Sequence, residues 1–513
     1  MGGSRATYPR LLLLLSAAIV LVAMIPLFFV VGYVVSTGWD EAVTLIWRPR
    51  VGELFRNTGL LVTGCVGLTA VLGTGAAWLV ERTTLPGRRV WNVLLVAPLA
   101  VPAFVNSFGW VSLTARVEGY AGALLIVSLS YYPLVFLPVA AMLRGLDPAL
   151  EETAAALGHS PWRTFIRVVL PQLRPALLGG TLIVALHVLA EFGALQLLRF
   201  PTFTTAIYDL YRSSFNGPAA NMLAGVLLLS CLLLLTLELR LRGHHRYSRL
   251  GGGSARTIPR KRLGRATAPC LLAVGGLTAL ALGVPLGSLA YWLATGSSTS
   301  FPIGDLARTT ATSLGLGVAG AILAMALAFP IAWLCVRRRG RLTILMERLT
   351  YFGNAVPGIV VALALVTVSI RFAPAVYQTL VLLVLAYAIM FLPRALVSLR
   401  SGLAQAPPAL EEAAQALGVS PGRSRLRVTL PMMAPSAAAA AALVALGIAN
   451  ELTATLLLAP NGTRTLATEF WSASNSVAYT DAAPYALLLI LASVPVVAIL
   501  FAQTRRTSQK GKP

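Results

Sequence analysis

The stretch Glu151-Glu-Thr-Ala-Ala-Ala-Leu-Gly158, followed by Ser160-Pro161, decides the fold because it occurs twice. The second copy begins at Glu411 and reads Glu-Glu-Ala-Ala-Gln-Ala-Leu-Gly, again followed one residue later by Ser-Pro. From Glu151 to Pro171, 13 of 21 positions are identical to the second copy. A repeat of this kind indicates two copies of one structural unit.

Each copy of the motif predicts two short helices joined by a turn. Pro148 and Pro408 suit the first position of a helix, where a missing N–H costs nothing. Gly158 and Gly418 follow Leu as helix-ending residues that adopt positive φ without strain. The Ser-Pro pairs then restart a helix, with Ser as the N-cap and Pro at the first helical position.

The composition places the chain in a membrane. Of its 513 residues, 57% are hydrophobic and 12% are charged, whereas soluble proteins have about 45–50% and about 25%. Apolar runs of about 20 residues recur along the chain, and each is long enough to cross a bilayer as a helix. We therefore predict an all-α integral membrane fold. The run from Leu11 to about Val35 is interpreted as an uncleaved anchor.

The distribution of basic residues predicts the topology. With the N-terminus inside, 30 of the 41 Lys and Arg residues fall in cytoplasmic segments and 9 in extracytoplasmic ones, as the positive-inside rule requires. The net charge of +23 therefore reflects membrane topology and not nucleic-acid binding. Both termini are expected to be cytoplasmic. We predict twelve spans, near residues 11–35, 58–80, 91–113, 122–143, 176–198, 221–239, 269–294, 312–336, 348–370, 376–396, 435–458 and 484–503.

The spans divide into two repeats of six. The first repeat covers residues 1–239 and the second covers 269–513, with a basic cytoplasmic linker at 240–268. An even number of crossings gives both repeats the same orientation, related by an axis along the membrane normal. Translocation is expected where the repeats meet. The repeated motif lies in cytoplasmic loops at 144–175 and 397–434.

No chemistry of an enzyme stands out in the sequence. The four cysteines have no close spacing, which argues against a metal cluster or a disulfide framework. His244-His245 is interpreted as an exposed linker dipeptide and not as a metal pair. No catalytic residue and no metal site is predicted.

The repeated motif resembles the signature loop of binding-protein-dependent ABC importer permeases. That signature is Glu-Ala-Ala, three residues, Gly, nine residues, an aliphatic residue, one residue and Leu-Pro. The second copy matches throughout, and the first departs only at Thr153. The resemblance implies that each loop forms a coupling helix seated in a cleft of an ATPase subunit. The coupling residues that it implies are Glu152, Ala154, Ala156, Leu157, Gly158, Glu412, Ala413, Ala414, Leu417 and Gly418.

The same resemblance implies the partners. The chain has no Gly-x-x-x-x-Gly-Lys-Ser/Thr phosphate-binding loop, so we expect ATP and Mg²⁺ to be held by two separate ATPase subunits. We expect an extracytoplasmic substrate-binding protein and membrane lipid as the other partners. No cofactor is expected in this chain, which would lie in a bacterial inner membrane.

Two acidic residues inside predicted spans are candidates for the transport pathway. Glu191 and Glu451 occupy equivalent repeat positions, with His187 one turn before the first and Asn450 beside the second. A charge at the centre of a span costs about 2.5–3.5 kcal/mol on insertion scales, so such residues face a water path or an internal partner. The sequence leaves both interpretations open: a polar pathway lining that accepts a cation, or an internally paired structural acid.

The substrate is suggested by a further resemblance. The segments 189–194 and 201–208, with 450–458 and 465–468, resemble the fused ferric-iron permeases. Ferric iron is therefore the expected substrate, and thiamine, phosphonate or polyamine are the alternatives. A secondary transporter, which also has twelve spans in two halves, is a remote alternative.

Overall fold

The computed structural model describes residues 10–38, 43–44, 47–214, 216–242, 260–295, 301–338 and 340–509. These residues are helical and form no β-strand, as the sequence predicts. The linker residues His244-His245 and both ends of the chain lie outside this description.

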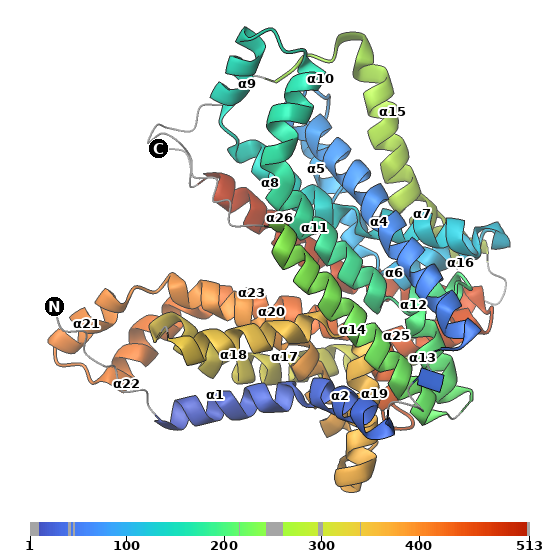
Figure 1. The fold of residues 1–513 in the computed structure, drawn as a ribbon, viewed down its shortest axis with the longest axis vertical. Helices are drawn as coiled ribbons and strands as arrows, with labels where there is room; N and C mark the ends of the chain where they lie inside the picture. The colour runs from blue at the N-terminus through green and yellow to red at the C-terminus, as the bar shows by residue number, and fades with distance from the viewer. Residues whose placement is uncertain are drawn as a thin grey trace. The chain divides into compact units, whose positions relative to one another are not determined.

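The helices are numbered along the chain (Figure 1). Those of the first repeat are α1 (Arg10–Ala23), α2 (Ile25–Thr37), α4 (Pro49–Arg82), α5 (Arg88–Leu94), η1 (Ala97–Ala100), α6 (Ala103–Val111), η2 (Ala115–Val117), α7 (Tyr120–Tyr131), α8 (Pro133–Gly145), α9 (Pro148–Ala156), α10 (Pro161–Thr164), η3 (Phe165–Val169), α11 (Leu170–Ala190), α12 (Gly193–Leu197), α13 (Phe203–Arg212) and α14 (Gly217–Arg242).

The second repeat follows the same order after the linker. Its helices are η4 (Gly264–Ala266), α15 (Thr267–Thr278), η5 (Ala279–Gly283), α16 (Val284–Thr295), α17 (Ile303–Arg337), α18 (Arg341–Phe352), η6 (Gly353–Ala355), α19 (Gly358–Phe372), η7 (Pro374–Val376), α20 (Leu380–Ala404), α21 (Pro408–Ala416), α22 (Pro421–Ser424), η8 (Arg425–Thr429), α23 (Leu430–Ala449), α24 (Thr453–Leu458), α25 (Leu466–Asn475) and α26 (Tyr479–Gln509).

The number of spans agrees only in part with the twelve predicted. Among the described residues, seven helices are long and apolar enough to cross a membrane, and the number rises to ten if each bent pair is one span. The bent pairs are α1 with α2 at 50°, α5–η1 with α6 at 92°, and α7 with α8 at 41°. The coarse prediction of a polytopic helical membrane protein is confirmed.

Two predicted spans are interrupted at equivalent proline positions. The predicted span 91–113 turns through 92° between η1 and α6, and the predicted span 348–370 breaks into α18, η6 and α19. Each break has an extended residue, Val101 or Val356, directly before a proline. Proline excludes the helical conformation from the residue that precedes it, and Pro102 and Pro357 then cap the next helix. Neither predicted span is therefore one continuous helix.

Two further predicted spans are interrupted near the acidic residues. The predicted span 176–198 contains the end of α11, a break at Glu191 and the short helix α12. The predicted span 435–458 contains the end of α23, a break at Asn450-Glu451 and α24. Both acids therefore lie at a helix end inside an apolar segment.

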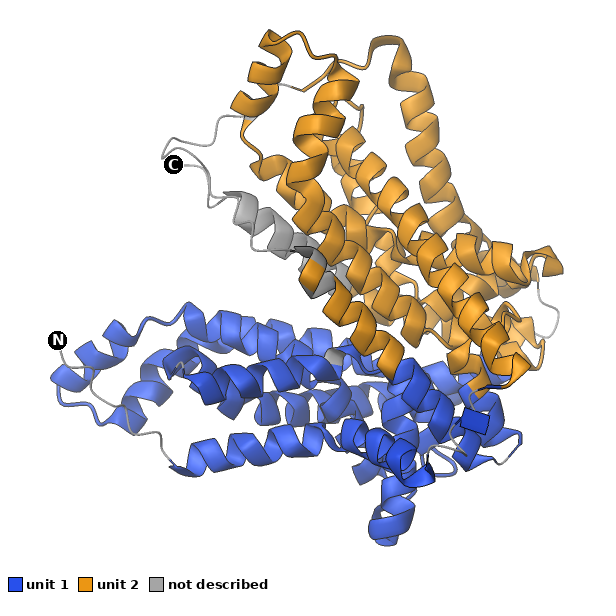
Figure 2. Cartoon of the chain, in the orientation of Figure 1, with its two compact units in different colours: residues 1–47, 207–228, 301–472 blue, residues 48–206, 229–300, 473–513 orange. Residues whose placement is uncertain are grey.

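The chain forms two compact units that do not follow the two sequence repeats (Figure 2). Unit 1 consists of residues 1–47, 207–228 and 301–472, and unit 2 consists of 48–206, 229–300 and 473–513. In unit 1, α17 packs on α20 and α23, and α1 also contacts α17. In unit 2, α4 packs on α8 and α11, and α16 packs on α6 and α26. Each unit therefore combines helices from both repeats.

The apolar interiors of the units position the loops and the acids. In unit 2 the core contains the fully buried Tyr132 and Phe136, which lie at and beyond the bend between α7 and α8. In unit 1 the fully buried Tyr387 on α20 has the equivalent place in the sequence. Part of the linker is also fixed, because Lys261 N donates to Arg82 O at 2.9 Å beside the end of α4.

Candidate coupling loops and transport pathway

Each repeated loop folds as a short helix, a left-handed glycine and a second short helix. The first loop consists of α9, Gly158 at φ +78° and α10. The second consists of α21, Gly418 at φ +85° and α22. The predicted helix-turn-helix form and the positive φ of both glycines are therefore confirmed. Each loop projects from one end of the bundle of its own unit (Figure 1).

The caps of these helices differ between the copies. In the first loop, Asp147 Oδ1 accepts from Ala149 N at 3.0 Å and Ser160 Oγ accepts from Arg163 N at 3.3 Å. In the second loop, Pro407 precedes α21, and the Ser420 side chain makes no capping hydrogen bond. Ser is therefore the N-cap residue in both copies, as predicted, but only Ser160 makes the capping hydrogen bond.

Most of the coupling residues lie on the loop surface. Glu152 and Glu412 are exposed, and the exposed fractions of Leu157 and Leu417 are 74% and 86%. Each loop therefore presents an exposed leucine and an exposed glutamate on its surface. Ala156, Gly158, Ala413 and Gly418 are also exposed.

Two alanines from the same set face inward. Ala154 is 5% exposed, and Ala414 is half-buried. Successive residues of a helix are about 100° apart, so the alanines that follow each glutamate cannot all share its face. Ala154 and Ala414 therefore lie on the less exposed face of their helices.

The glutamate before each coupling glutamate makes an ion pair that the sequence analysis missed. Glu151 Oε1 lies 3.0 Å from Nη2 of Arg82, at the end of α4. Glu411 Oε1 accepts a hydrogen bond of 2.7 Å from Nη2 of Arg337, at the end of α17. All four side chains are at most 15% exposed. The repeated Glu-Glu pair was visible in the sequence. Which glutamate faces inward and which faces solvent depends on the orientation of the helix.

Glu191 lies at the break after α11 and is held by hydrogen bonds. Its Oε1 accepts from Ala194 N at 3.0 Å, and its Oε2 accepts a short hydrogen bond from the Tyr131 hydroxyl. The Thr204 hydroxyl donates to its backbone oxygen at 2.5 Å. The His187 ring lies 5.3 Å from the Tyr131 ring, edge to face, so these side chains form one polar group.

Glu451 repeats the backbone part of this arrangement with different side chains. Its Oε1 accepts from Ala454 N at 3.1 Å, and Thr455 Oγ1 donates to its backbone oxygen at 2.6 Å. Thr455 Oγ1 also shares a 2.7 Å hydrogen bond with the Tyr387 hydroxyl. Asn450 Nδ2 donates to Leu446 O at 2.9 Å within α23.

The electrostatic surroundings of the two acids are unequal. Phe136-Leu-Pro138 and Phe391-Leu-Pro393 are equivalent in the two repeats, so Arg394 stands where the first repeat has Val139. The positive charge of Arg394 on α20 interacts with Glu451. Glu451 therefore has an internal counter-charge, whereas the side-chain group around Glu191 consists of a phenol and an imidazole.

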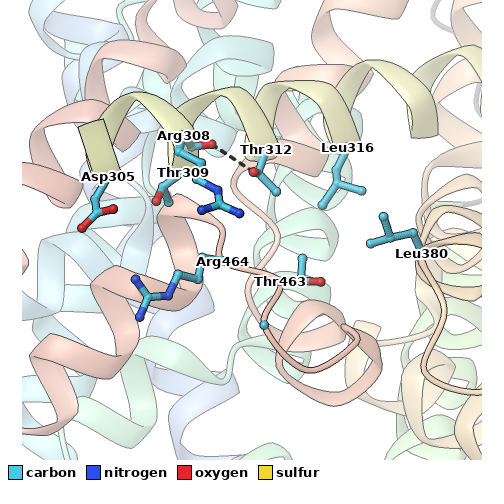
Figure 3. Close-up of a pocket in the computed structure, with 9 residues that line it drawn as sticks. Asp305, Arg308, Thr309, Thr312, Leu316, Leu380, Thr463 and Arg464 are labelled. Atoms are coloured by element: carbon cyan, nitrogen blue, oxygen red, sulfur yellow. Dashed lines mark hydrogen bonds between the residues drawn. The ribbon is translucent and has the colours of Figure 1, made fainter. Parts of the chain in front are cut away.

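A polar pocket of about 440 Å³ lies at the start of α17, the end opposite to Arg337 (Figure 3). Arg308 and Thr312 on α17 line it together with Thr463 and Arg464 from the loop before α25. Arg308 extends from α17 toward that loop, and Asp305 lies at the edge (Figure 3). Arg464 Nε lies 3.5 Å from Glu469 Oε1, and the Arg308 guanidinium can bind an anionic side chain or ligand. The sequence analysis gave no signal for this pocket.

Comparison with known proteins supports the resemblance found in the loops. The family model of the binding-protein-dependent transport system inner membrane component matches residues 70–241 and again 317–510. The Fe(3+)-transport system permease protein FbpB 2 of Haemophilus influenzae is 40% identical over 494 residues, which cover 95% of this chain and 97% of that protein.

Shorter permeases match about half of the chain. The sulfate transport system permease protein CysT of Escherichia coli is 30% identical over 256 residues, which are 45% of this chain and 92% of that protein. The sulfate permease CysW of Synechocystis is 27% identical over 255 residues. The two family matches and the full-length likeness agree, and the chain therefore belongs to the binding-protein-dependent ABC permeases, of which it is a fused two-copy member.

Proposed function

We propose that this chain carries ferric iron across the inner membrane as the permease of an ATP-driven importer. The observation that carries the choice of substrate is the 40% identity along nearly the whole chain to a permease named for Fe(3+) transport. The sulfate permeases match only about half of the chain and at lower identity. The phenol and carboxylate of Tyr131 and Glu191 also favour a cation, because a buried carboxylate repels an oxyanion.

The coupling loops are proposed to receive two ATPase subunits. Glu152 and Glu412, with Leu157 and Leu417, present an acidic and apolar surface on each loop. Closure of the ATPase subunits on ATP and Mg²⁺ would bring the loops together and bias the chain toward its outward-open state, and hydrolysis would reset it. The ATPase subunits then hydrolyse ATP, and this chain converts their movement into transport.

The remaining parts of the proposed cycle concern the substrate. We propose that Glu191, His187, Asn450 and Glu451 line the pathway. The pocket of Arg308 and Arg464 lies at the end of α17 remote from the coupling loop, which places it on the extracytoplasmic side in the proposed topology. We expect an acidic side chain of the binding protein to contact this pocket.

The decisive experiment measures uptake of radioactive ferric iron into vesicles that contain this chain, its ATPase and its loaded binding protein. Iron uptake that occurs with ATP and is lost without it supports the proposal. Thiamine and sulfate, each with its own binding protein, serve as competing substrates. Uptake of either of them without uptake of iron would overturn the proposal of ferric iron as the substrate. The proposal that the chain is an importer permease would stand.

A further inference from the structure

We propose that Arg82 and Arg337 are positioning residues that fasten each coupling loop to the long helix before it. In this arrangement, movement of a loop is passed to α4 in unit 2 and to α17 in unit 1. The inference rests on the proposed function, because it assigns to these arginines the transmission of ATPase movement from the same loops. We call each set of side chains described below a clamp.

The clamps begin with one sequence pattern at the ends of two helices. The helix α4 ends Ala-Trp78-Leu-Val-Glu-Arg82, and α17 ends Ala-Trp333-Leu-Cys-Val-Arg337. Residues four apart lie on one face of a helix. The Arg82 guanidinium lies 6.0 Å from the Trp78 ring, and that of Arg337 lies 5.4 Å from the Trp333 ring. Stacking on the indole orients each guanidinium toward its loop.

The acid of each clamp comes from the first helix of the loop. Glu151 and Glu411 pair with Arg82 and Arg337 at N···O distances of 3.0 Å and 2.7 Å. Arg82 is 4% exposed and Arg337 is 10% exposed. Loss of one partner from such a buried pair leaves an uncompensated charge, so the pair resists separation more strongly than a surface ion pair.

The second half of each loop reaches the same tryptophan. The Phe165 ring lies 4.8 Å from the Trp78 ring in an edge-to-face arrangement. The Arg425 guanidinium, at the equivalent repeat position, lies 5.4 Å from the Trp333 ring. Both residues begin a π-helical turn, Phe165–Val169 or Arg425–Thr429, a local irregularity that often occurs at functional sites. Each tryptophan therefore contacts the second half of its loop, and the arginine stacked on it pairs with the first helix of the same loop.

The second clamp has additional hydrogen bonds inside the loop. Thr429 Oγ1 donates to Glu411 Oε1 at 2.5 Å, and Ser424 Oγ donates to Glu411 O at 3.2 Å. Glu411 thus connects α21, the π-turn after α22 and the end of α17. Connected sets of packed and hydrogen-bonded groups of this kind carry energetic coupling from one element to another.

The helix α17, to which the second clamp fastens its loop, is long. With 35 residues, α17 spans about 52 Å at about 1.5 Å per residue. Its first turns carry Asp305 and Arg308, which line the polar pocket. A displacement imposed at Arg337 is therefore carried by one continuous helix to the opposite end of unit 1.

The test compares iron uptake with ATP hydrolysis in vesicles that contain the full chain, its ATPase and its binding protein. Arg82→Ala with Arg337→Ala should lower the iron transported per ATP hydrolysed by about ten-fold, within the about 5- to 150-fold range of coupling between sites. The ATPase should still co-purify with the chain, because Glu152 and Glu412 are unchanged. The matched control, Arg89→Ala with Arg338→Ala near the same helix ends, should keep the ratio.

Two further variants separate transmission from a structural role. Arg337→Glu should uncouple transport, and the exchange Arg337→Glu with Glu411→Arg should restore at least half of the lost ratio. Should the double alanine variant fail to fold, Arg82→Lys with Arg337→Lys keeps the charges, loses the planar stacking and should lower the ratio by about three-fold. An unchanged ratio, or a loss of transport that equals the loss of co-purified ATPase, overturns the clamp.

The failure of the clamp is distinguishable from that of the proposed function. If Glu152→Arg with Glu412→Arg leaves ATPase co-purification intact, the coupling surface is wrong and the clamp fails with it. If that variant releases the ATPase while the clamp variants couple normally, only the clamp is overturned.

Discussion

The two coupling loops have the same backbone but are fastened differently. In unit 2, Trp78 is surrounded by Arg82, Phe165 and Lys261, whose amine lies 5.3 Å from the indole. In unit 1, Trp333 is contacted by the guanidinium groups of Arg337 and Arg425. The first clamp therefore draws its extra cation from the linker, and the second draws it from the loop itself.

The acids of the two clamps are also satisfied differently. Glu411 accepts hydrogen bonds from Arg337 and Thr429. The buried Oε1 of Glu151 has no hydrogen-bond partner among the described residues, although it pairs electrostatically with Arg82. The difference teaches that a duplicated loop can keep its position through electrostatics in one copy and through a hydrogen-bonded group in the other.

The largest expected effect separates the clamps by stability. Arg82→Ala should lower the free energy of unfolding by about 3–5 kcal/mol, since it leaves Glu151 as an uncompensated buried charge. Arg337→Ala should cost less, because Thr429 still donates to Glu411. Thermal unfolding in detergent measures both variants. Equal losses of stability in the two variants, or the reversed order, would contradict the proposed difference between the clamps.

The next largest effect is the loss of iron uptake when the exposed glutamates of the coupling loops, Glu152 and Glu412, are reversed in charge. We expect Glu152 and Glu412 to meet basic groups in the ATPase cleft. Glu152→Arg with Glu412→Arg should therefore lower iron uptake at least about 100-fold, because a like-charge contact at an interface costs several kcal/mol. The matched control is Glu53→Arg, which reverses an exposed acid that pairs with Arg50 outside the loops and should leave uptake unchanged. Single variants of the loops reveal whether one loop contributes more than the other.

The turn between the helices provides a smaller effect. Gly418→Val should destabilise the loop by about 1–2 kcal/mol, because a β-branched residue is strained at φ +85°. A side chain at Gly418 or at Gly422 would meet open space, and Gly422 is not among the residues with positive φ. Gly422→Val is therefore the control. Equal transport by the two variants would contradict the strain argument.

The two acids proposed to line the pathway, Glu191 and Glu451, can be compared in the same way. Glu191→Gln should lower iron uptake by about ten-fold, corresponding to about 1.4 kcal/mol of lost interaction with the cation. Glu451→Gln should have the weaker effect, because Arg394 already offsets that charge. Uptake is measured at matched ATPase content. Normal uptake by the double variant would exclude a pathway role for both acids.

The smallest expected effect is at the outer pocket. Arg308→Glu with Arg464→Glu should slow the association of the binding protein by about three-fold or more and make it less sensitive to salt, since exposed interface charges act mainly on association rates. Binding to the reconstituted chain at two salt concentrations measures this. Unaltered association would remove the pocket from the docking surface.

The sequence predicted the local form of the loops because their signals are local. Proline, glycine and serine at fixed offsets specify where helices begin and end, and Gly158 and Gly418 have the expected φ values. The helix breaks at Pro102 and Pro357 were also marked by proline, but the apolar composition of both segments concealed them. These positions show that hydropathy alone is a poor guide to continuous helices.

Tertiary packing determines what the sequence could not predict. The Trp-x-x-x-Arg endings at Arg82 and Arg337 are visible as a repeat, but pairing with Glu151 and Glu411 depends on which face each loop helix turns inward. The counter-charge at Glu451 comes from Arg394 on another helix. In both cases the partners are far apart in sequence, and periodicity carries no information about them.

The interleaved units also have a consequence for how the protein is made. Residues 1–47 belong to unit 1 together with 301–472, so the helices α1 and α2 have no complete packing partner until the second repeat has been synthesised. Joining both repeats in one polypeptide keeps these helices beside the segments they need at a fixed stoichiometry. A chain cut at the linker would yield two fragments of which neither holds a whole unit.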